Sequence, residues 1–127
     1  MQTVVVEWKH LDKDGQTCDR CEETGTGIDA MVQELAVACK GKGVEVVFKE
    51  TLLTADQIDQ SNLILINGKP VEDILPDAKV SESCCCSCGD LTGKDEVCRT
   101  IIRFGVEYEA IPSQMVREAI CRVAGCC

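Results

Sequence analysis

Cysteine is the residue type with which this sequence could do chemistry, and its first group is the pair Cys18 and Cys21. Two residues between two cysteines bring the sulfurs within reach of one disulfide. A nearby cation or helix N-terminus then favours the thiolate form of the attacking cysteine. Arg20 lies between the two, and His10 could approach them. We therefore predict thiol–disulfide exchange, in which Cys18 attacks as the thiolate and Cys21 resolves the mixed disulfide.

The same pair admits two other interpretations. Its CxxC spacing also suits two thiolate ligands on one tetrahedral metal ion. Alternatively, both cysteines are unreactive members of a loop, because the acidic neighbours Asp19, Glu22 and Glu23 oppose formation of a thiolate. If the pair is catalytic, the protein is a thiol–disulfide oxidoreductase and requires a redox partner protein.

A second group of cysteines lies in the polar segment 77–99, which is rich in Ser, Gly and Asp. Residues 85–89 form a CxxCG pattern, in which the amides of a turn point at two thiolates and the glycine permits the tight geometry. Cys98 could supply a third ligand. The fourth would come from another member of the segment or from the terminal pair 126–127. The candidate metal ligands of the segment are Cys84, Cys85, Cys86, Cys88 and Cys98.

Such a thiolate cluster would bind a soft ion. Four thiolates form a common structural site for zinc, whereas three suit pyramidal arsenite, or mercury or copper(I). The cluster could instead relay electrons to Cys18 and Cys21, or it could be a disordered, partly oxidised segment. A non-catalytic protein that binds a thiophilic metal or metalloid is therefore our alternative function.

The cysteine-rich segment is also poor in residues that could form a core. Between Asp77 and Glu96 the large apolar residues other than cysteine are Val80 and Leu91. Two such side chains offset little of the backbone entropy lost when some twenty residues become ordered. We therefore expect residues 81–99 to have no fixed structure unless a metal or a disulfide orders them.

The remaining cysteines give weaker indications. Cys39 falls on the apolar face of a predicted helix, where a buried cysteine behaves as a small hydrophobic residue. Cys121 lies beside the apolar stripe of the last helix, and the sequence does not assign it a role. We expect Cys126 and Cys127 to be mobile, because they stand at a chain end.

Composition excludes several classes of protein. A chain of 127 residues fits one domain, which we take to be 1–127. The net charge of −9 argues against nucleic-acid binding, and no apolar run approaches the roughly 20 residues of a membrane span. The eleven cysteines are odd in number and clustered, and no signal peptide precedes them, so we expect a cytoplasmic protein.

The elements that position these cysteines follow from the hydrophobic pattern. A strand over 3–8 precedes the CxxC pair, and apolar residues at helical spacing predict a helix over 28–40. Asn67-Gly68 predicts a type I′ hairpin turn, and Pro70 places the strand after it at a sheet edge. The later elements are expected over 44–49, 63–66, 69–72, 100–104, 106–110 and 112–124.

This order predicts an α/β protein of thioredoxin-like outline. The strand–helix–strand unit implies a parallel pair with a right-handed crossover, and the hairpin adds antiparallel strands. The expected architecture is a central mixed sheet flanked by helices, with a cysteine-rich insertion over 77–99 before the last strands and the C-terminal helix.

Five ordered motifs also resemble an uncharacterised family of cysteine-rich, thioredoxin-like proteins of bacteria and archaea, the domain of unknown function 2703. The resemblance covers nearly the whole chain and implies a fold and a placement of cysteines, without a known activity. The motifs occupy residues 17–21, 61–72, 84–90, 98–100 and 108–112.

The sequence departs from active thioredoxins in two places. Thioredoxins carry a cis proline before the third strand, facing the dithiol, whereas residues 60–63 contain no proline. Residues 22–27 are polar and contain glycine, so they separate Cys21 from the predicted helix. We therefore expect the two thiols to lie away from the helix N-terminus.

Overall fold

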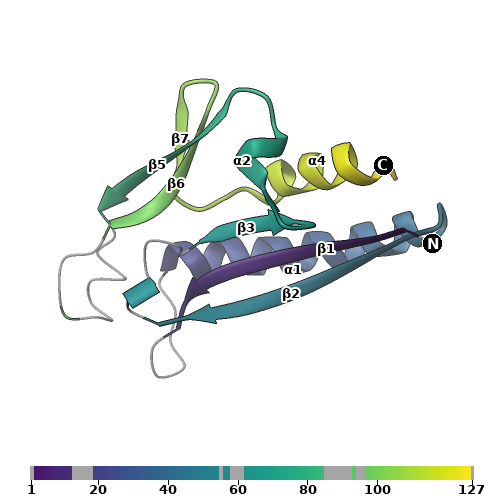
Figure 1. Ribbon diagram of the computed structural model, residues 1–127, viewed down its shortest axis with the longest axis horizontal. Coiled ribbons are helices and arrows are strands. Elements are labelled where there is room, and N and C mark those ends of the chain that lie inside the picture. Colours follow the sequence, from purple (N-terminus) through teal and green to yellow (C-terminus); the bar gives the residue numbers. More distant parts are fainter. Residues whose placement is uncertain are drawn as a thin grey trace.

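The computed structural model describes residues 2–12, 19–54, 56–57, 62–84, 93 and 97–126, and for residues 19, 20, 83, 84, 97 and 98 it describes the backbone alone. Figure 1 shows the arrangement of the elements. In chain order they are β1 (Gln2–Leu11), α1 (Asp19–Lys40), β2 (Val44–Leu53), β3 (Leu63–Ile66), β4 (Lys69–Pro70), α2 (Val71–Ile74), β5 (Ala78–Cys84), β6 (Val97–Arg103), β7 (Val106–Tyr108) and α4 (Ser113–Ala124).

The first four strands form one mixed sheet in the order β2-β1-β3-β4. Strand β1 pairs in parallel with β2, where Val6 lies opposite Phe48, and antiparallel with β3, where Val6 lies opposite Ile66. Asn67 and Gly68 both have positive φ, as the predicted type I′ turn requires, and the short β4 with Pro70 is the sheet edge. The predicted mixed α/β architecture is confirmed.

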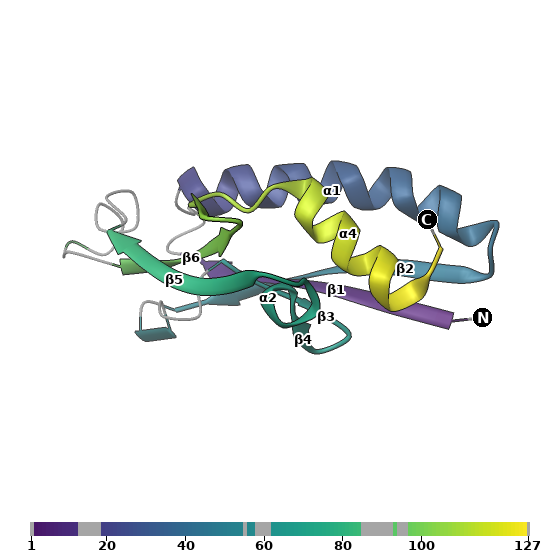
Figure 2. The ribbon, with the colours of Figure 1, turned by 90° about the horizontal axis from the view of Figure 1, so that it is seen from above.

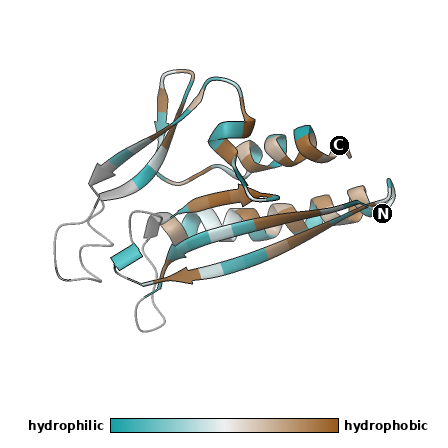
Figure 3. Cartoon of the chain, viewed as in Figure 1, coloured by the Kyte–Doolittle hydropathy of each residue, from teal (hydrophilic) through white to brown (hydrophobic). Residues whose placement is uncertain are grey.

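Helices α1 and α4 lie side by side on one face of this sheet (Figure 2). Alternate residues of β1, namely Val4, Val6 and Trp8, are buried beneath them, because successive side chains of a strand point to opposite faces. Strand β3 is apolar along its whole length and contributes Ile64 and Ile66 to the same core (Figure 3). No helix among the described residues is long and apolar enough to cross a membrane.

Helix α1 begins nine residues before its predicted start. The buried positions Cys21, Thr24, Gly25 and Ile28 follow the three-to-four-residue spacing of a helix, but two of them are not apolar residues, so the hydrophobic pattern did not reveal them. Gly25 does not break the helix. Instead it leaves room for the indole of Trp8, since a Cβ built at this position would overlap the ring.

The last three strands form a second sheet in the order β5-β6-β7. The two arms of the segment that we expect to need a metal or a disulfide are strands that were not predicted: Ala78–Cys84 pairs with Val97–Arg103. Two residues beyond the segment support this pairing, since the buried Thr100 and Ile101 anchor β6 to the core. The cysteines at 85, 86 and 88 lie outside the described residues.

Ion pairs also fix this second sheet to the rest of the molecule. Arg99 pairs with Glu72 of α2, and Arg103 forms two hydrogen bonds with Glu118 of α4, at 3.1 and 2.7 Å. The hydrogen bond from Arg103 lowers the pKa of the Glu118 carboxyl, although burial opposes this shift. The same hydrogen bond raises the pKa of Arg103. The arms of the hairpin are thereby held against two helices.

The contact between α1 and Trp8 gives a matched pair of substitutions. Gly25→Ala should lower the free energy of unfolding by about 1–3 kcal/mol, because the methyl group overpacks against the indole. Gly27→Ala should leave stability unchanged or raise it by up to about 1 kcal/mol, since its Cβ would meet Ser113 only at 3.6 Å and alanine favours a helix. Urea unfolding measures both, and equal effects would contradict the assigned start of α1.

Candidate functional site

The first turn of α1 carries the described half of the CxxC pair. Cys21 is the third residue of this helix, and its side chain is fully buried in the hydrophobic core. The expectation that residues 22–27 hold the dithiol away from the helix is therefore wrong. Cys21 is therefore not exposed at the surface, and Cys18 lies outside the described residues.

The end of β1 brings an imidazole and an indole to the same region. His10 is buried and stacks on Trp8, with ring centroids 3.7 Å apart and an interplanar angle of 15°. Its Nε2 lies 3.0 Å from Glu50 Oε2 on β2, and its Nδ1 lies 3.1 Å from the carbonyl oxygen of Leu11. His10 is thus a buried residue near the end of β1, and it has a carboxylate partner.

A buried amide joins this region to the start of β3. Asn62 Oδ1 accepts a hydrogen bond of 3.2 Å from the indole N–H of Trp8. Its Nδ2 donates to Thr24 Oγ1 of α1 at 3.1 Å and to the carbonyl oxygen of Glu109 at 3.5 Å. Thr24 Oγ1 in turn accepts the backbone N–H of Ile111 at 2.9 Å. One side chain therefore links β1, α1 and the segment that precedes α4.

Asn62 was not predicted as a site residue, although one signal was present in the sequence. The residue has φ of 62°, in the left-handed region that asparagine tolerates better than most residues. It stands immediately before β3. An asparagine directly before a predicted buried strand could therefore have been considered a backbone-shaping residue.

A cavity of about 500 Å³ lies beside the first turns of α1. The strands contribute Trp8 and His10 from β1 and Phe48 and Glu50 from β2, and α1 contributes residues of its facing side between positions 22 and 29. Glu22 lines the cavity, whereas the preceding residue Cys21 is not among its described lining residues and is buried in the core. Its described lining combines two aromatic side chains, Trp8 and Phe48, with an imidazole and three carboxylates.

The cysteines of the second sheet lie at one end of the β5–β6 ladder. Cys84 is the last residue of β5 and lies opposite Val97, and Cys98 lies opposite Ser83. The pairing thus brings the backbones of Cys84 and Cys98 to neighbouring positions, although 13 residues separate them in the chain. Within the described part of the chain, no group of three or more potential ligand residues is placed to hold a metal ion.

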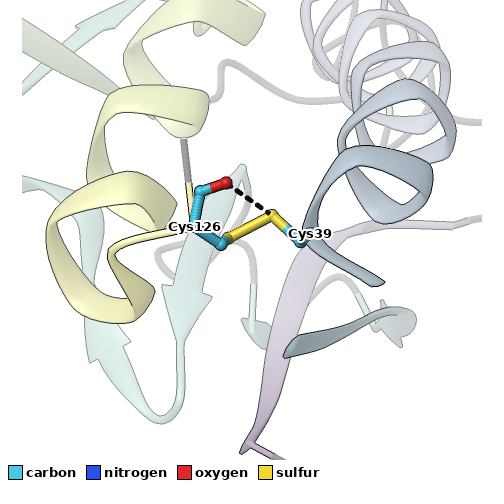
Figure 4. The surroundings of a disulfide bond; sticks show 2 residues. All are labelled: Cys39 and Cys126. Atoms are coloured by element: carbon cyan, nitrogen blue, oxygen red, sulfur yellow. Dashed lines mark hydrogen bonds between the residues drawn. A yellow bond between two sulfur atoms is a disulfide. The ribbon is translucent and has the colours of Figure 1, made fainter. Parts of the chain in front are cut away.

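The C-terminal cysteines differ from their predictions. Cys39, at the end of α1, is buried as predicted, but it forms a disulfide with Cys126 rather than acting as a simple core residue (Figure 4). Cys126 is buried, so the predicted mobility is wrong for it, and Cys121 of α4 is also disulfide-bonded. Cys127 lies outside the described residues. The Cys39 sulfur lies 3.6 Å from the Cys126 carbonyl oxygen, a contact that can be a hydrogen bond only when Cys39 is a thiol.

This disulfide lies far from Cys21 and from the cysteines of the β5–β6 ladder. Cys21 and Cys39 stand near opposite ends of the 22-residue helix α1, a separation that corresponds to about 27 Å at the rise of an α-helix. Figure 1 also shows the C-terminus and the end of β5 at opposite ends of the molecule. Cys126 is therefore not placed to be the fourth ligand of a site at Cys84 and Cys98.

Comparison with known proteins identifies the family. The model of the family described as "Domain of unknown function (DUF2703)" matches residues 4–120, so the chain belongs to this family. An uncharacterised protein of Archaeoglobus fulgidus is 40% identical over 92 residues, a match that covers 68% of this chain and 66% of that protein. No solved structure matches the chain significantly.

The hydrogen bonds of Asn62 lead to a stability prediction. Asn62→Ala should lower the free energy of unfolding by about 2–4 kcal/mol, because it leaves the Trp8 N–H without its acceptor and puts alanine at positive φ. Asn62→Gly can retain the backbone conformation, so its free energy of unfolding should fall only by the contribution of the lost side-chain hydrogen bonds. Urea unfolding and tryptophan fluorescence measure both effects. Wild-type stability and emission in Asn62→Ala would contradict the assigned network.

Proposed function

We propose that this protein performs thiol–disulfide exchange on a thioredoxin-like domain, with Cys18 as the attacking thiolate and Cys21 as the resolving cysteine. The observation that carries the proposal is the position of Cys21, the third residue of the helix that directly follows β1. The strand order β2-β1-β3-β4, with β1 parallel to β2 and antiparallel to β3, supports the thioredoxin-like assignment.

The burial of Cys21 supports this division of roles. An attacking cysteine must reach the disulfide of a second molecule, whereas a resolving cysteine needs to reach only the sulfur of its neighbour. Cys21 is fully buried, which suits the second role and not the first. The partial positive charge at the N-terminus of a 22-residue helix also favours thiolate at its first turn.

Asn62, which contacts α1 from the start of β3, also supports the proposal. In thioredoxins, the loop before the third strand faces the dithiol and is shaped by a cis proline. Here Asn62 stands directly before β3, and its left-handed backbone and three hydrogen bonds fix it against Trp8 and Thr24 of α1. A residue fixed beside α1 at this position supports the analogy without a proline. A cytoplasmic location and a redox partner protein complete this proposal.

A second candidate function rests on the register of the β5–β6 ladder. Because Cys84 and Cys98 come to neighbouring backbone positions, residues 85–96 form the connection between two paired strands. A connection of this length that carries three further cysteines could wrap a thiophilic ion such as zinc or arsenite. This alternative uses Cys84, Cys85, Cys86, Cys88 and Cys98 and needs no catalytic dithiol.

Single cysteine variants test the exchange function. Trypsin cleaves after Lys13 and Arg20, so the peptide 14–20 carries Cys18 and no other cysteine. Reduced Cys21→Ser, mixed with a protein disulfide, should accumulate a stable adduct on peptide 14–20. Wild type should release the partner and link this peptide to peptide 21–40. Mass spectrometry of the digests measures both products.

The controls separate the two candidate functions. Cys98→Ser should exchange at the wild-type rate, because it leaves the CxxC pair intact. Cys18→Ser lacks the attacking thiol, so it should form no mixed disulfide with the partner protein at this pair. If Cys21→Ser traps no partner on peptide 14–20, while purified protein contains stoichiometric metal that Cys98→Ser loses, the exchange function is wrong and the binding function is supported.

A further inference from the structure

Strand β2 is an outer strand of the main sheet, so one side of its backbone faces away from the sheet (Figure 1). The amide of Asp12 donates to the carbonyl oxygen of Leu53 at 3.1 Å, which shows that the odd-numbered residues of β2 direct their backbone groups at β1. The even-numbered residues between 44 and 52 therefore direct their N–H and C=O groups outward. Within the described part of the chain, no strand pairs with these outward groups.

This edge lacks the features that usually keep an outer strand from pairing. Strand β2 has ten residues, it contains no proline or glycine, and it pairs with β1 in an unbroken register without a bulge. Natural proteins often protect a long edge with a proline, a bulge or a short strand. Two apolar side chains of β2 are also exposed, Val47 to 37% and Leu52 to 55%. The edge is therefore a regular template for another strand.

The charges of β2 make the strand complementary to itself. In an antiparallel pair about a two-fold axis, each contact occurs twice. Even-numbered residues must lie opposite even-numbered ones, because they carry the outward groups. With the axis at Val47, each Lys49 lies opposite the partner's Glu45.

The neighbouring registers are less favourable. An axis at residue 48 leaves every charge of β2 without an opposite charge across the interface, and an axis at 49 or 50 puts like charges face to face. An axis at residue 46 pairs only residues 44–48 of each strand. The charge pattern therefore selects the axis at Val47.

The rows of side chains on the face away from the helices match in this register. Val5 lies opposite Val47 within one chain, so the axis creates a row of four valines across four strands. Glu7 lies opposite Lys49, and its Oε2 is 3.9 Å from the lysine Nζ. Each Lys49 would thus lie between Glu7 of its own chain and the partner's Glu45. Cross-strand pairs of both kinds stabilise a sheet.

We propose that two copies of this chain form a dimer through antiparallel pairing of their β2 strands about a two-fold axis at Val47. The two main sheets then form one continuous sheet, and the interface uses residues 44–50 of each copy. An interface made mainly by two strands is small, so the dimer dissociates reversibly on dilution. The proposal does not depend on the exchange function.

Charge reversals test the register by sedimentation equilibrium, on protein whose accessible thiols are alkylated so that no intermolecular disulfide forms. Wild type should shift from monomer to dimer as its concentration rises. Glu45→Lys and Lys49→Glu should each weaken the dimer on the order of tenfold, because like charges then meet at both ends of the interface. Glu45→Lys should do so although it reduces the net negative charge of the chain.

Mixing the two variants gives a test that does not depend on a loss. In a heterodimer of Glu45→Lys with Lys49→Glu, both facing pairs have opposite charges again, so the equimolar mixture should dimerise about as well as wild type. Arg117→Glu is the matched control, because it reverses a charge at an exposed position of α4, away from β2. It should dimerise like wild type.

A cross-link tests the position of the axis. Trypsin cleaves after Lys42 and Lys49, so peptide 43–49 contains no native cysteine. Val47→Cys, oxidised mildly with diamide, should yield this peptide linked to itself, because facing residues at the axis are within disulfide reach. Val5→Cys is the control on the same row of valines. Its two copies would lie about 14 Å apart, so peptide 1–9 should not link to itself.

Three results would overturn the proposal. Wild type that stays monomeric up to about 0.5 mM would show that the edge does not pair with a second copy. A dimer that persists in both charge-reversal variants, or a mixture that stays monomeric, would show that residues 45 and 49 do not face each other. Equal cross-linking of Val5→Cys and Val47→Cys would contradict the axis at residue 47.

Discussion

The hydrogen bonds of one buried amide hold together the region on which the proposed chemistry depends. Asn62 uses both ends of its side chain, accepting from Trp8 and donating to Thr24 and to the carbonyl of Glu109. Through these partners it sets the distance between β1, the first turns of α1 and the segment before α4. Because Trp8 is fixed in turn against Gly25 and the ring of its stacked neighbour, the cavity and the start of the helix share the same support. A buried polar group of this kind is costly to leave unpaired, so its loss should disturb the whole region at once.

Much of the main sheet could be predicted from the sequence, because short local patterns of apolar residues specify its strands and its helix. The β-branched run near the N-terminus, the apolar run before Asn67-Gly68 and the helical spacing after Ile28 each specify an element by period alone. The start of α1 could not be predicted in this way, because Thr24 and Gly25 occupy buried helical positions for tertiary reasons. The β5–β6 arms were missed for a similar reason, since Ile101 anchors them from outside the polar segment.

The candidate site was only partly predictable. The CxxC spacing marked Cys21, but its burial and its place in the helix depend on contacts with other elements. Asn62 and the carboxylates of the cavity come from three separate parts of the chain, and no short motif joins them. The disulfide between Cys39 and Cys126 spans 87 residues, so only the packing of α4 beside α1 could show it. The described structure therefore separates a cross-link at one end of α1 from the proposed dithiol at the other.

The central claim is that Cys18 and Cys21 form one redox couple, and a redox titration tests it most directly. Native protein is equilibrated in dithiothreitol buffers of graded potential, alkylated, digested with trypsin and analysed by mass spectrometry. We expect peptide 14–20 to change from alkylated to linked with peptide 21–40 through Cys21, in one two-electron step, independently of the Cys39–Cys126 bond. If peptide 14–20 stays alkylated at every potential, or links instead to a cysteine of the segment 77–99, the claim is contradicted.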